Sequence, residues 1–337
     1  MTWTNTASRR KTETMDIQYL LVLQEFRNSI QDSLTPFMEW VSMFAITYLI
    51  LIPVFYYWNR DKKGGLYTLV SYYFCMVVKP LIKLTACVYR PWIRDSRILP
   101  AGDSITTATG YSFPSGHTTT AASLSGGTAV NTWRDRRTRW ISIVLLLYIP
   151  LTAFSRNYLG VHTPQDVLVA LLLSALSLIL TARLFGYLAE HPEKEDLLLL
   201  GGFLFCWAGL AYITLKPYPM DLNAAGELIV DPQKMMNDGY GDLGKMIGFI
   251  MARFIEKKWV QFRPLPNGWK SVVICLLGLI PMVLLQNYFS PFMIQRFGSH
   301  WGKLYFSILY TAYYIALFPF VLKMCGQHFM SKTPQIQ

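Results

Sequence analysis

Three short polar clusters interrupt the apolar stretches of this 337-residue chain, and their residue types suit phosphate chemistry. They occupy residues 83–91 (KLTACVYRP), 114–117 (PSGH) and 155–166 (SRNYLGVHTPQD). Each cluster lies at the end of an apolar stretch, where the chain would leave a helix of a bundle. If these ends share one face of the bundle, residues far apart in the sequence can form a single site.

The first and third clusters supply the cations Lys83, Arg90 and Arg156, which no acidic run matches. Buried near a membrane, these side chains would repel each other unless an anion joined them. A guanidinium binds two phosphate oxygens through parallel hydrogen bonds, and an ammonium adds a point charge. Ser115 and the backbone N–H groups of Gly116 and the following histidine would add donors at a helix start, where anions are favoured. The clusters therefore predict a phosphate site that would also stabilise charge developing during phosphoryl transfer.

Two histidines complete the set of groups that a covalent phosphohistidine route requires. His162 has Asp166 four residues further on, and the two can meet where the chain turns into a helix. A carboxylate on one imidazole nitrogen fixes the tautomer and leaves the other nitrogen free as a nucleophile. His117 can then protonate the leaving oxygen and afterwards deprotonate the water that hydrolyses the phosphohistidine.

Taken singly, each cluster has an ordinary structural explanation. A lone Lys83 at a helix end is usually a membrane-interface anchor, and PSGH often starts a helix. The third cluster alone is typical of a polar loop with an ion pair. The three clusters together, in this order and on one face, are not explained in that way, so we favour the catalytic interpretation.

The motifs Lys-x6-Arg-Pro, Pro-Ser-Gly-His and Ser-Arg-x5-His-x3-Asp resemble those of the type 2 phosphatidic acid phosphatase (PAP2) superfamily, and this chain matches each in full. The resemblance implies a metal-independent phosphatase with no cofactor, on a six-span helical core that reaches about residue 215. It implies that His162 is the nucleophile, Asp166 its partner, and His117 the acid and base. The implied phosphate ligands are Lys83, Arg90, Ser115, Gly116 and Arg156.

The elements that must position these residues are membrane helices. Hydrophobic residues make up 53% of the chain and charged residues only 15%, whereas a soluble chain has about a quarter charged residues. A span needs roughly 20 mostly apolar residues. We expect spans at residues 38–58, 66–89, 115–133, 140–154, 166–185, 197–215, 243–262, 271–288 and 303–322. Residues 16–33 predict an amphipathic interfacial helix, with a soluble-facing core helix as the alternative.

The predicted fold is an all-α integral membrane protein with a six-span PAP2-like core and about three further C-terminal helices. Residues 1–37 would form a polar tail and the interfacial helix, and residues 38–215 the catalytic core. An extracytoplasmic loop at 216–242 and membrane helices at 243–337 would follow. The third span is polar, so we expect it inside the bundle, where its small residues allow close packing. The seventh segment, with Lys245 and Arg253, is expected to span, although an interfacial helix is the alternative.

Basic residues gather at 60–63, 134–139 and 257–270, after the first, third and seventh expected spans. The positive-inside rule places these loops in the cytoplasm, so the three polar clusters emerge on the other side. We therefore expect a multi-pass protein of the plasma (cytoplasmic) membrane with an extracytoplasmic site. These loops also account for much of the net charge of +11. No basic stripe lies on a soluble element, so nucleic-acid binding is not expected.

The sequence thus predicts a membrane lipid phosphatase acting on a lipid phosphate monoester or pyrophosphate, with the bilayer and a phosphorylated lipid as its partners. The alternatives are a lipid phosphotransferase that uses the same intermediate, and a non-catalytic protein that binds or transports a lipid phosphate. Arg94, Arg97 and Tyr111, between the first two clusters, are candidates for contacting the lipid head group, and a solvated loop is the alternative. No ligand spacing indicates a metal site.

Overall fold

The computed structural model describes residues 15–108, 110–223, 225–265 and 268–331, with side chains up to residue 325. The polar tail predicted for residues 1–15 lies outside these ranges, apart from its last residue. The described chain is helical and forms no strand, apart from one isolated bridge between Leu222 and Leu228. The prediction of an all-α fold is confirmed.

The helices follow one another along the chain with short connections. The first eight are α1 (Met15–Ser29), α2 (Thr35–Thr47), α3 (Leu51–Asn59), α4 (Lys62–Ala86), α5 (Pro91–Arg94), α6 (Ser104–Thr107), α7 (Gly116–Thr132) and α8 (Arg139–Tyr158). The others are α9 (Pro164–Glu190), α10 (Glu195–Leu215), α11 (Pro232–Ile255), α12 (Trp269–Leu284), α13 (Ser290–Phe297), α14 (Ser299–Ala312) and α15 (Phe318–Ser331). Single π turns extend α11, α12 and α14 at their C-terminal ends.

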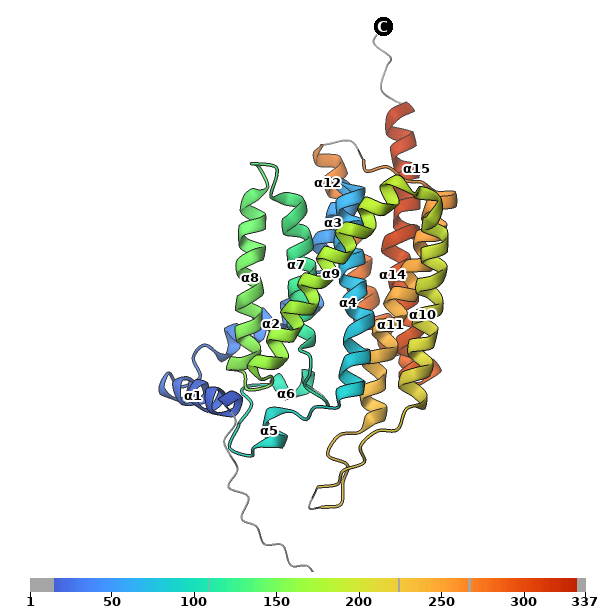
Figure 1. The fold of residues 1–337 in the computed structure, drawn as a ribbon. Coiled ribbons are helices and arrows are strands. Elements are labelled where there is room, and N and C mark those ends of the chain that lie inside the picture. Colours follow the sequence, from blue (N-terminus) through green and yellow to red (C-terminus); the bar gives the residue numbers. More distant parts are fainter. Residues whose placement is uncertain (1–14, 109, 224, 266–267, 332–337) are drawn as a thin grey trace, which may run out of the picture.

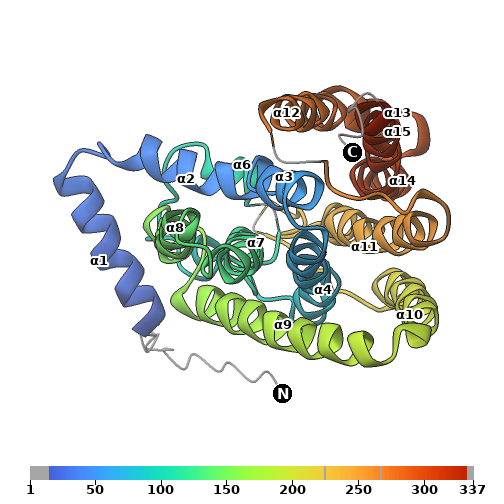
Figure 2. The same cartoon turned by 90° about the horizontal axis from the view of Figure 1, so that it is seen from above.

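The long helices run alongside one another in a bundle (Figure 1). Viewed from above, α7 and α4 lie near the middle, with α2 and α3 on one side and α9 along the other (Figure 2). Helix α11 lies between α4 and α14, so the C-terminal helices join the core directly. Helix α1 lies across the direction of the bundle, as expected of an interfacial helix.

Six helical stretches of the described chain are long and apolar enough to cross a membrane. They are Lys62–Arg94, Arg139–Tyr158, Pro164–Glu190, Pro192–Leu215, Trp269–Phe297 and Ser299–Cys325. The bent pair α2–α3 would be a seventh span. These stretches confirm the prediction of a multi-pass membrane protein.

The first predicted span, residues 38–58, is not one continuous helix. The chain breaks between α2 and α3, and the two helix axes differ by 43°. Pro53 has no backbone N–H to donate to the carbonyl four residues earlier, and its ring disfavours a helix running through that position. The sequence prediction missed this break because the whole stretch is apolar.

The predicted loop at 216–242 is too long by eleven residues, because α11 begins at Pro232 rather than near residue 243. Asp231 caps the helix by accepting a hydrogen bond from the backbone N–H of Gln233 (2.9 Å), and proline suits the first helical turn. Hydropathy missed the first turns of α11 because they carry polar residues and glycines. Helix α11 runs through the bundle beside α4 and α14, and not across it (Figure 1).

Helix α7 shows why a polar sequence can lie inside a membrane bundle. Every residue from His117 to Ala129 is buried. Several of its hydroxyls bond within the helix, as when Ser123 Oγ donates to the Thr119 carbonyl (2.7 Å). A Cβ atom on Gly127 would lie 2.9 Å from the Cα of Thr68, so the absence of a side chain lets α7 and α4 approach closely.

The two ends of the bundle carry different loops. The α7–α8 turn lies at one end, and α5, α6 and the α10–α11 connection lie at the other (Figure 1). The ends of α4 and α8 and the starts of α7 and α9 that carry the three polar clusters also face this second end. All three clusters are therefore available to one site.

Candidate active site

The site is built where four helices begin or end. Lys83 lies in the last turn of α4, His117 in the first turn of α7 and Arg156 in the last turn of α8. His162 follows in the α8–α9 connection, and Asp166 lies in the first turn of α9. All five side chains lie at the same end of the bundle.

The backbone at the start of α9 fixes the Asp166 carboxylate, which also contacts His162. Thr163 and Asp166 form a capping box at the start of α9, in which the Thr163 N–H donates to Asp166 Oδ2 (2.9 Å). The same oxygen lies 3.2 Å from His162 Nδ1, and Ser112 Oγ donates to Oδ1 (3.3 Å). The carboxylate therefore links the segment before the second motif to the third motif and holds the imidazole.

The second nitrogen of the His162 imidazole, Nε2, contacts Arg90. Arg90 Nη1 lies 2.9 Å from His162 Nε2 and also donates to the Val161 carbonyl (2.9 Å). A guanidinium can only donate, so His162 Nε2 must accept, and the ring proton belongs on Nδ1, where it donates to Asp166. This tautomer leaves the Nε2 lone pair directed away from the carboxylate, which a nucleophile requires.

Burial and neighbouring cations keep His162 neutral. Removal of the ring from water, followed by the charges of Arg90, Arg156 and Lys83, holds the pKa of His162 well below its usual range. The neutral imidazole is the form that carries the lone pair. The arrangement therefore keeps the ring neutral at neutral pH.

Lys83 positions the irregular segment before α7. Its Nζ donates to the carbonyls of Tyr111 and Ser112 (2.9 Å each), while its side chain lines the cavity described below. Ser115 is the N-cap of α7, and its Oγ accepts a hydrogen bond from the Thr118 N–H (3.4 Å). The start of α7, at Gly116, thus points its backbone donors toward the same space as Lys83.

Several buried donors near the site have no hydrogen-bond partner among the described residues. They are Nε and Nη2 of Arg156 and Nε2 of His117. The third guanidinium nitrogen, Nη1 of Arg156, donates to Ser42 Oγ on α2. Buried polar groups are normally satisfied, so this pair of side chains has bonding capacity that suits an oxyanion.

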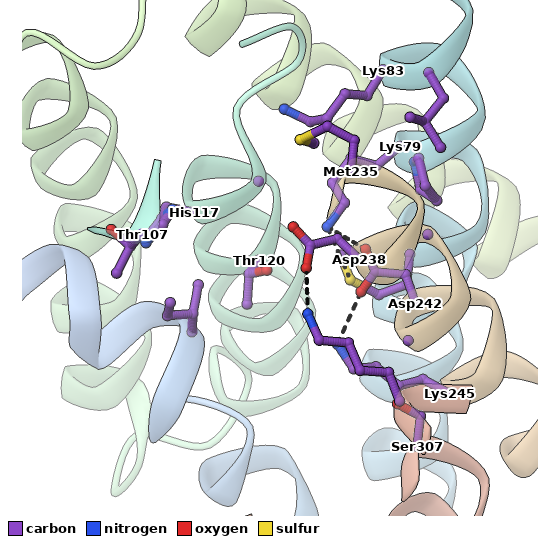
Figure 3. Close-up of a pocket in the computed structure, with 18 of the residues that line it drawn as sticks. Lys79, Lys83, Thr107, His117, Thr120, Met235, Asp238, Asp242, Lys245 and Ser307 are labelled. Carbon is purple, nitrogen blue, oxygen red and sulfur yellow. Dashed lines mark hydrogen bonds and ion pairs between the residues drawn. The ribbon is translucent and has the colours of Figure 1, made fainter. Parts of the chain in front are cut away.

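A cavity of about 500 Å³ lies at this end of the bundle, and His117 lines it, whereas Arg156 and Ser115 do not. Arg90, Gly116, His117 and His162 line one side of it. The opposite side comes from α4, with Lys83, and from α11 and α14 (Figure 3). The cavity is large enough for a phosphorylated head group in contact with the imidazoles.

The three residues proposed from the sequence to contact the head group do not line this cavity. Arg94 pairs with Asp16 of α1 (2.9 Å), and Arg97 pairs with Asp95 (2.9 Å). Tyr111 is fully buried. Arg94 and Arg97 thus anchor the α5 region, while Tyr111 contributes its carbonyl to Lys83.

Sequence reasoning missed the charged residues on the opposite wall of the cavity. Lys79 of α4 and Asp238, Asp242 and Lys245 of α11 line it (Figure 3). Their signal was present, because ionisable residues within membrane helices mark functional sites by default. Lys79 lies in the predicted second span, one turn before Lys83, and the first residues of α11 fall in the predicted loop.

The described residues contain no group of three or more His, Cys, Asp or Glu side chains placed to hold a metal ion. The cavity side chains named above are dominated by cations and imidazoles. Such a set suits an anion in direct contact with the protein.

The fold and the site together define a helical multi-pass membrane protein with a cationic, histidine-containing cavity at one end. The chain belongs to the PAP2 superfamily, whose model matches residues 64–190. This match contains all three motifs and ends with α9, so α10 to α15 lie outside it.

Individual relatives agree with this assignment. Undecaprenyl-diphosphatase of Bacillus subtilis is 31% identical over 150 residues, which cover 44% of this chain and 72% of that protein. Phosphatidylglycerophosphatase B of Escherichia coli is 40% identical over 91 residues, covering 26% of this chain and 35% of that protein. Undecaprenyl-diphosphatase of Sulfolobus acidocaldarius is 28% identical over 132 residues, covering 39% and 57%. No solved structure matches this chain.

Proposed function

We propose that this protein is a membrane lipid phosphatase that hydrolyses a lipid phosphate monoester or diphosphate through a phosphohistidine formed at His162. The observation that carries the proposal is the imidazole of His162, held between Asp166 (3.2 Å from Nδ1) and Arg90 (2.9 Å from Nε2). Covalent phosphoryl transfer needs a histidine whose tautomer is fixed by a carboxylate, a nearby cation for the phosphate, and a second histidine in the same cavity.

In the first step, Nε2 of His162 attacks phosphorus. A P–N bond forms while the bond from phosphorus to the lipid-side oxygen breaks, and that oxygen keeps the electron pair. His117 donates a proton to the leaving oxygen. Asp166 accepts the hydrogen bond from Nδ1–H throughout, which stabilises the positive charge that the ring gains on phosphorylation.

In the second step, water attacks the phosphohistidine. His117, now neutral, removes a proton from the water as the new P–O bond forms. The P–N bond breaks, its electron pair returns to Nε2, and inorganic phosphate leaves. Both histidines are then back in their starting protonation states.

The phosphate ligands we propose are Lys83, Arg90, Ser115, Gly116 and Arg156. Arg156 has two unpartnered buried donors in a fixed fork, which fits two oxygens of one phosphoryl group. Gly116 contributes a backbone N–H at the start of α7, where the helix dipole favours an anion. Arg156 and the start of α7 are held before substrate arrives, by Ser42 and by the Ser115 cap, so they need little reorganisation in the transition state. Arg90 must exchange its bond to His162 Nε2 for a phosphate oxygen before that nitrogen attacks.

The proposed reaction requires no metal, because protein cations and a helix start already surround the phosphate. Phosphate release by the purified protein should therefore continue at an unchanged rate after treatment with EDTA. Strong inhibition by EDTA that added metal reverses would contradict this part of the proposal.

We place the site at the extracytoplasmic face of the membrane, most simply the plasma membrane. The support is that the basic loops after α3 and α7 lie at the opposite end of the bundle from the motifs. The substrate would reach the cavity from the outer leaflet. Labelling of single cysteines in intact cells, one in the α7–α8 turn and one in the α10–α11 connection, would test the orientation.

The relatives act on two kinds of lipid, as their names say, an undecaprenyl diphosphate and a phosphatidylglycerophosphate. We carry over to this chain only what these substrates share, a phosphate group on a membrane lipid. Phosphate release from a panel of lipid monophosphates and diphosphates in detergent would identify the substrate.

The decisive variant is His162→Ala, with His191→Ala as its matched control. His191 is half-exposed at the end of α9 and pairs with Glu193 (3.6 Å), away from the cavity. We expect His162→Ala to fold and to lose nearly all phosphate release, while His191→Ala keeps it. Unchanged turnover in His162→Ala would exclude the proposed mechanism.

A lipid phosphotransferase would use the same intermediate but pass the phosphate to an alcohol. The two activities separate when purified protein is given substrate without an acceptor. Hydrolysis predicts free phosphate under these conditions. No free phosphate, together with transfer to an added lipid alcohol, would show that the protein is a transferase.

A further inference from the structure

The wall of the cavity opposite the histidines carries its own charged group. Lys79 of α4 pairs with Asp242 Oδ2 of α11 (2.7 Å), and Lys245 of α11 pairs with Asp242 Oδ1 (2.9 Å). We call Lys79, Asp242 and Lys245 the α11 triad. The side chains of Lys79 and Asp242 are largely buried, with 13% and 8% of their surfaces exposed.

The α11 triad has one more positive than negative charge. Each oxygen of its single carboxylate already has an ammonium partner, so one cation is not neutralised within the group. An uncompensated charge inside a membrane bundle is costly unless an anion or water reaches it. The triad lines the cavity, where an anionic ligand could supply the balance.

Lys79 connects the α11 triad to the proposed phosphate site. It lies one helical turn before Lys83, so both lysines share a face of α4. A Cβ atom built on Gly116 would lie 3.6 Å from Lys79 Nζ, which places this ammonium against the start of α7. The reacting phosphate and the triad are therefore neighbours within one cavity (Figure 3).

Close packing fixes the position of this wall. Cβ atoms added to Gly244 and Gly248 of α11 would lie 2.8 Å from the Leu304 carbonyl oxygen and 2.7 Å from the Ile308 Cα of α14. The two helices can approach this closely only because glycines face the contact. Asp242 and Lys245 are thus held by a rigid helix pair, as a binding site requires.

We propose that the α11 triad is a second anion subsite, in which Lys79 and Lys245 bind a negatively charged group of the substrate next to the phosphate that reacts. Asp242 is a positioning residue that holds both ammonium groups until the anion arrives. The substrate class is then a lipid with two phosphates. This assignment rests on the proposed phosphatase function and uses α11, which lies outside the family match.

The second phosphate has two chemical sources. It can be joined directly to the reacting phosphate, as in a polyprenyl diphosphate, or separated from it by a glycerol, as in phosphatidylglycerol phosphate. The short distance between Lys79 and the start of α7 suits either arrangement. Phosphatidic acid, with one phosphate, is the matched substrate that cannot use the subsite.

A binding experiment tests the subsite without turnover. Methylenediphosphonate, a non-hydrolysable diphosphate analogue, and inorganic phosphate are titrated into the purified full-length protein in detergent. We expect Lys79→Gln to weaken methylenediphosphonate binding by about 10- to 100-fold and phosphate binding by less than about twofold. The control is Lys258→Gln, whose lysine pairs with Asp196 outside the cavity.

Removing the negative charge of Asp242 should strengthen the binding of methylenediphosphonate. Asp242→Asn removes the carboxylate that competes for both lysines, so methylenediphosphonate should bind more tightly than to the unchanged protein. Lys245→Gln keeps the Lys79–Asp242 pair, and it should weaken the binding of methylenediphosphonate. If the triad only stabilises the fold, all three variants would lower the melting temperature and leave the preference for methylenediphosphonate over phosphate unchanged, which would overturn the proposal.

Turnover then identifies the source of the second phosphate. Lys79→Gln should lower kcat/KM for the two-phosphate lipid that is the substrate by about 10- to 100-fold and leave kcat/KM for phosphatidic acid within about threefold. Equal losses for one- and two-phosphate lipids would refute the subsite. If no lipid phosphate is hydrolysed but the Lys79-dependent preference for methylenediphosphonate persists, the proposed function fails and the subsite stands.

Discussion

The contact between Asp166 and His162 allows a sharp test of how the nucleophile is prepared. In Asp166→Asn, the amide oxygen can keep the place of Oδ2, accepting from the Thr163 N–H (2.9 Å) and His162 Nδ1–H (3.2 Å). The amide NH₂ group then replaces Oδ1 and donates to Ser112 Oγ. The variant therefore removes the negative charge but retains the hydrogen bonds and the shape.

The expected loss follows from that charge. A hydrogen bond to a charged group is worth about 1.5–3 kcal/mol. The imidazole becomes cationic only as the P–N bond forms, so the loss falls on the transition state and the intermediate. At about 1.4 kcal/mol for each factor of ten, kcat should fall by about 10- to 150-fold. KM should change by less than about threefold, because the phosphate ligands remain.

The assay is phosphate release from a lipid substrate at saturating and limiting concentrations. Asp135→Asn is the matched control, because Asp135 lies in the α7–α8 turn at the opposite end of the bundle. A kcat for Asp166→Asn within twofold of the unchanged protein, with a normal melting temperature, would refute the role given to Asp166.

Three further predictions concern charge, pH and packing. Arg156→Lys keeps the positive charge but loses the planar fork, so kcat/KM should fall by about 10- to 100-fold; a change below twofold would contradict bidentate binding. The pKa of His162 is depressed by burial, Arg90 and other cations, and the neutral ring is the proposed nucleophile, so the acidic limb of kcat/KM that belongs to His162 should lie below the usual imidazole pKa of about 6.5. Arg90→Gln should move this acidic limb to higher pH, and an unmoved limb would exclude His162 as its origin. Gly127→Ala should lower the melting temperature because its Cβ would lie 2.9 Å from the Thr68 Cα, whereas Gly201→Ala, with nothing within 4 Å, should not.

The sequence singled out the residues of the candidate site because their chemistry is local and unusual, and their catalytic roles stay a prediction. Lys83, His117 and His162 are polar groups at the ends of apolar stretches, where a membrane protein has little other reason to place them. The capping box that fixes Asp166 is also readable from its neighbours. Convergence of the clusters then followed from counting membrane crossings.

The remaining features depend on contacts between distant segments. Arg94 pairs with Asp16 of α1, 78 positions earlier, and no local pattern encodes that partner. The early turns of α11 are polar because they face the cavity and Lys79, so a hydropathy pattern assigned them to a loop. The α2–α3 break is a third case, because Pro53 lies in an apolar stretch whose sequence pattern predicts a single span.

The covalent route through His162 is the central claim, and the stereochemical course at phosphorus tests it most directly. Each in-line displacement inverts the configuration of the phosphoryl group, so two successive displacements restore it. With a substrate chiral at phosphorus through oxygen isotopes and sulfur, we predict inorganic thiophosphate with retained configuration. Inversion would show that water attacks the lipid phosphate in a single step, and it would contradict a phosphohistidine at His162.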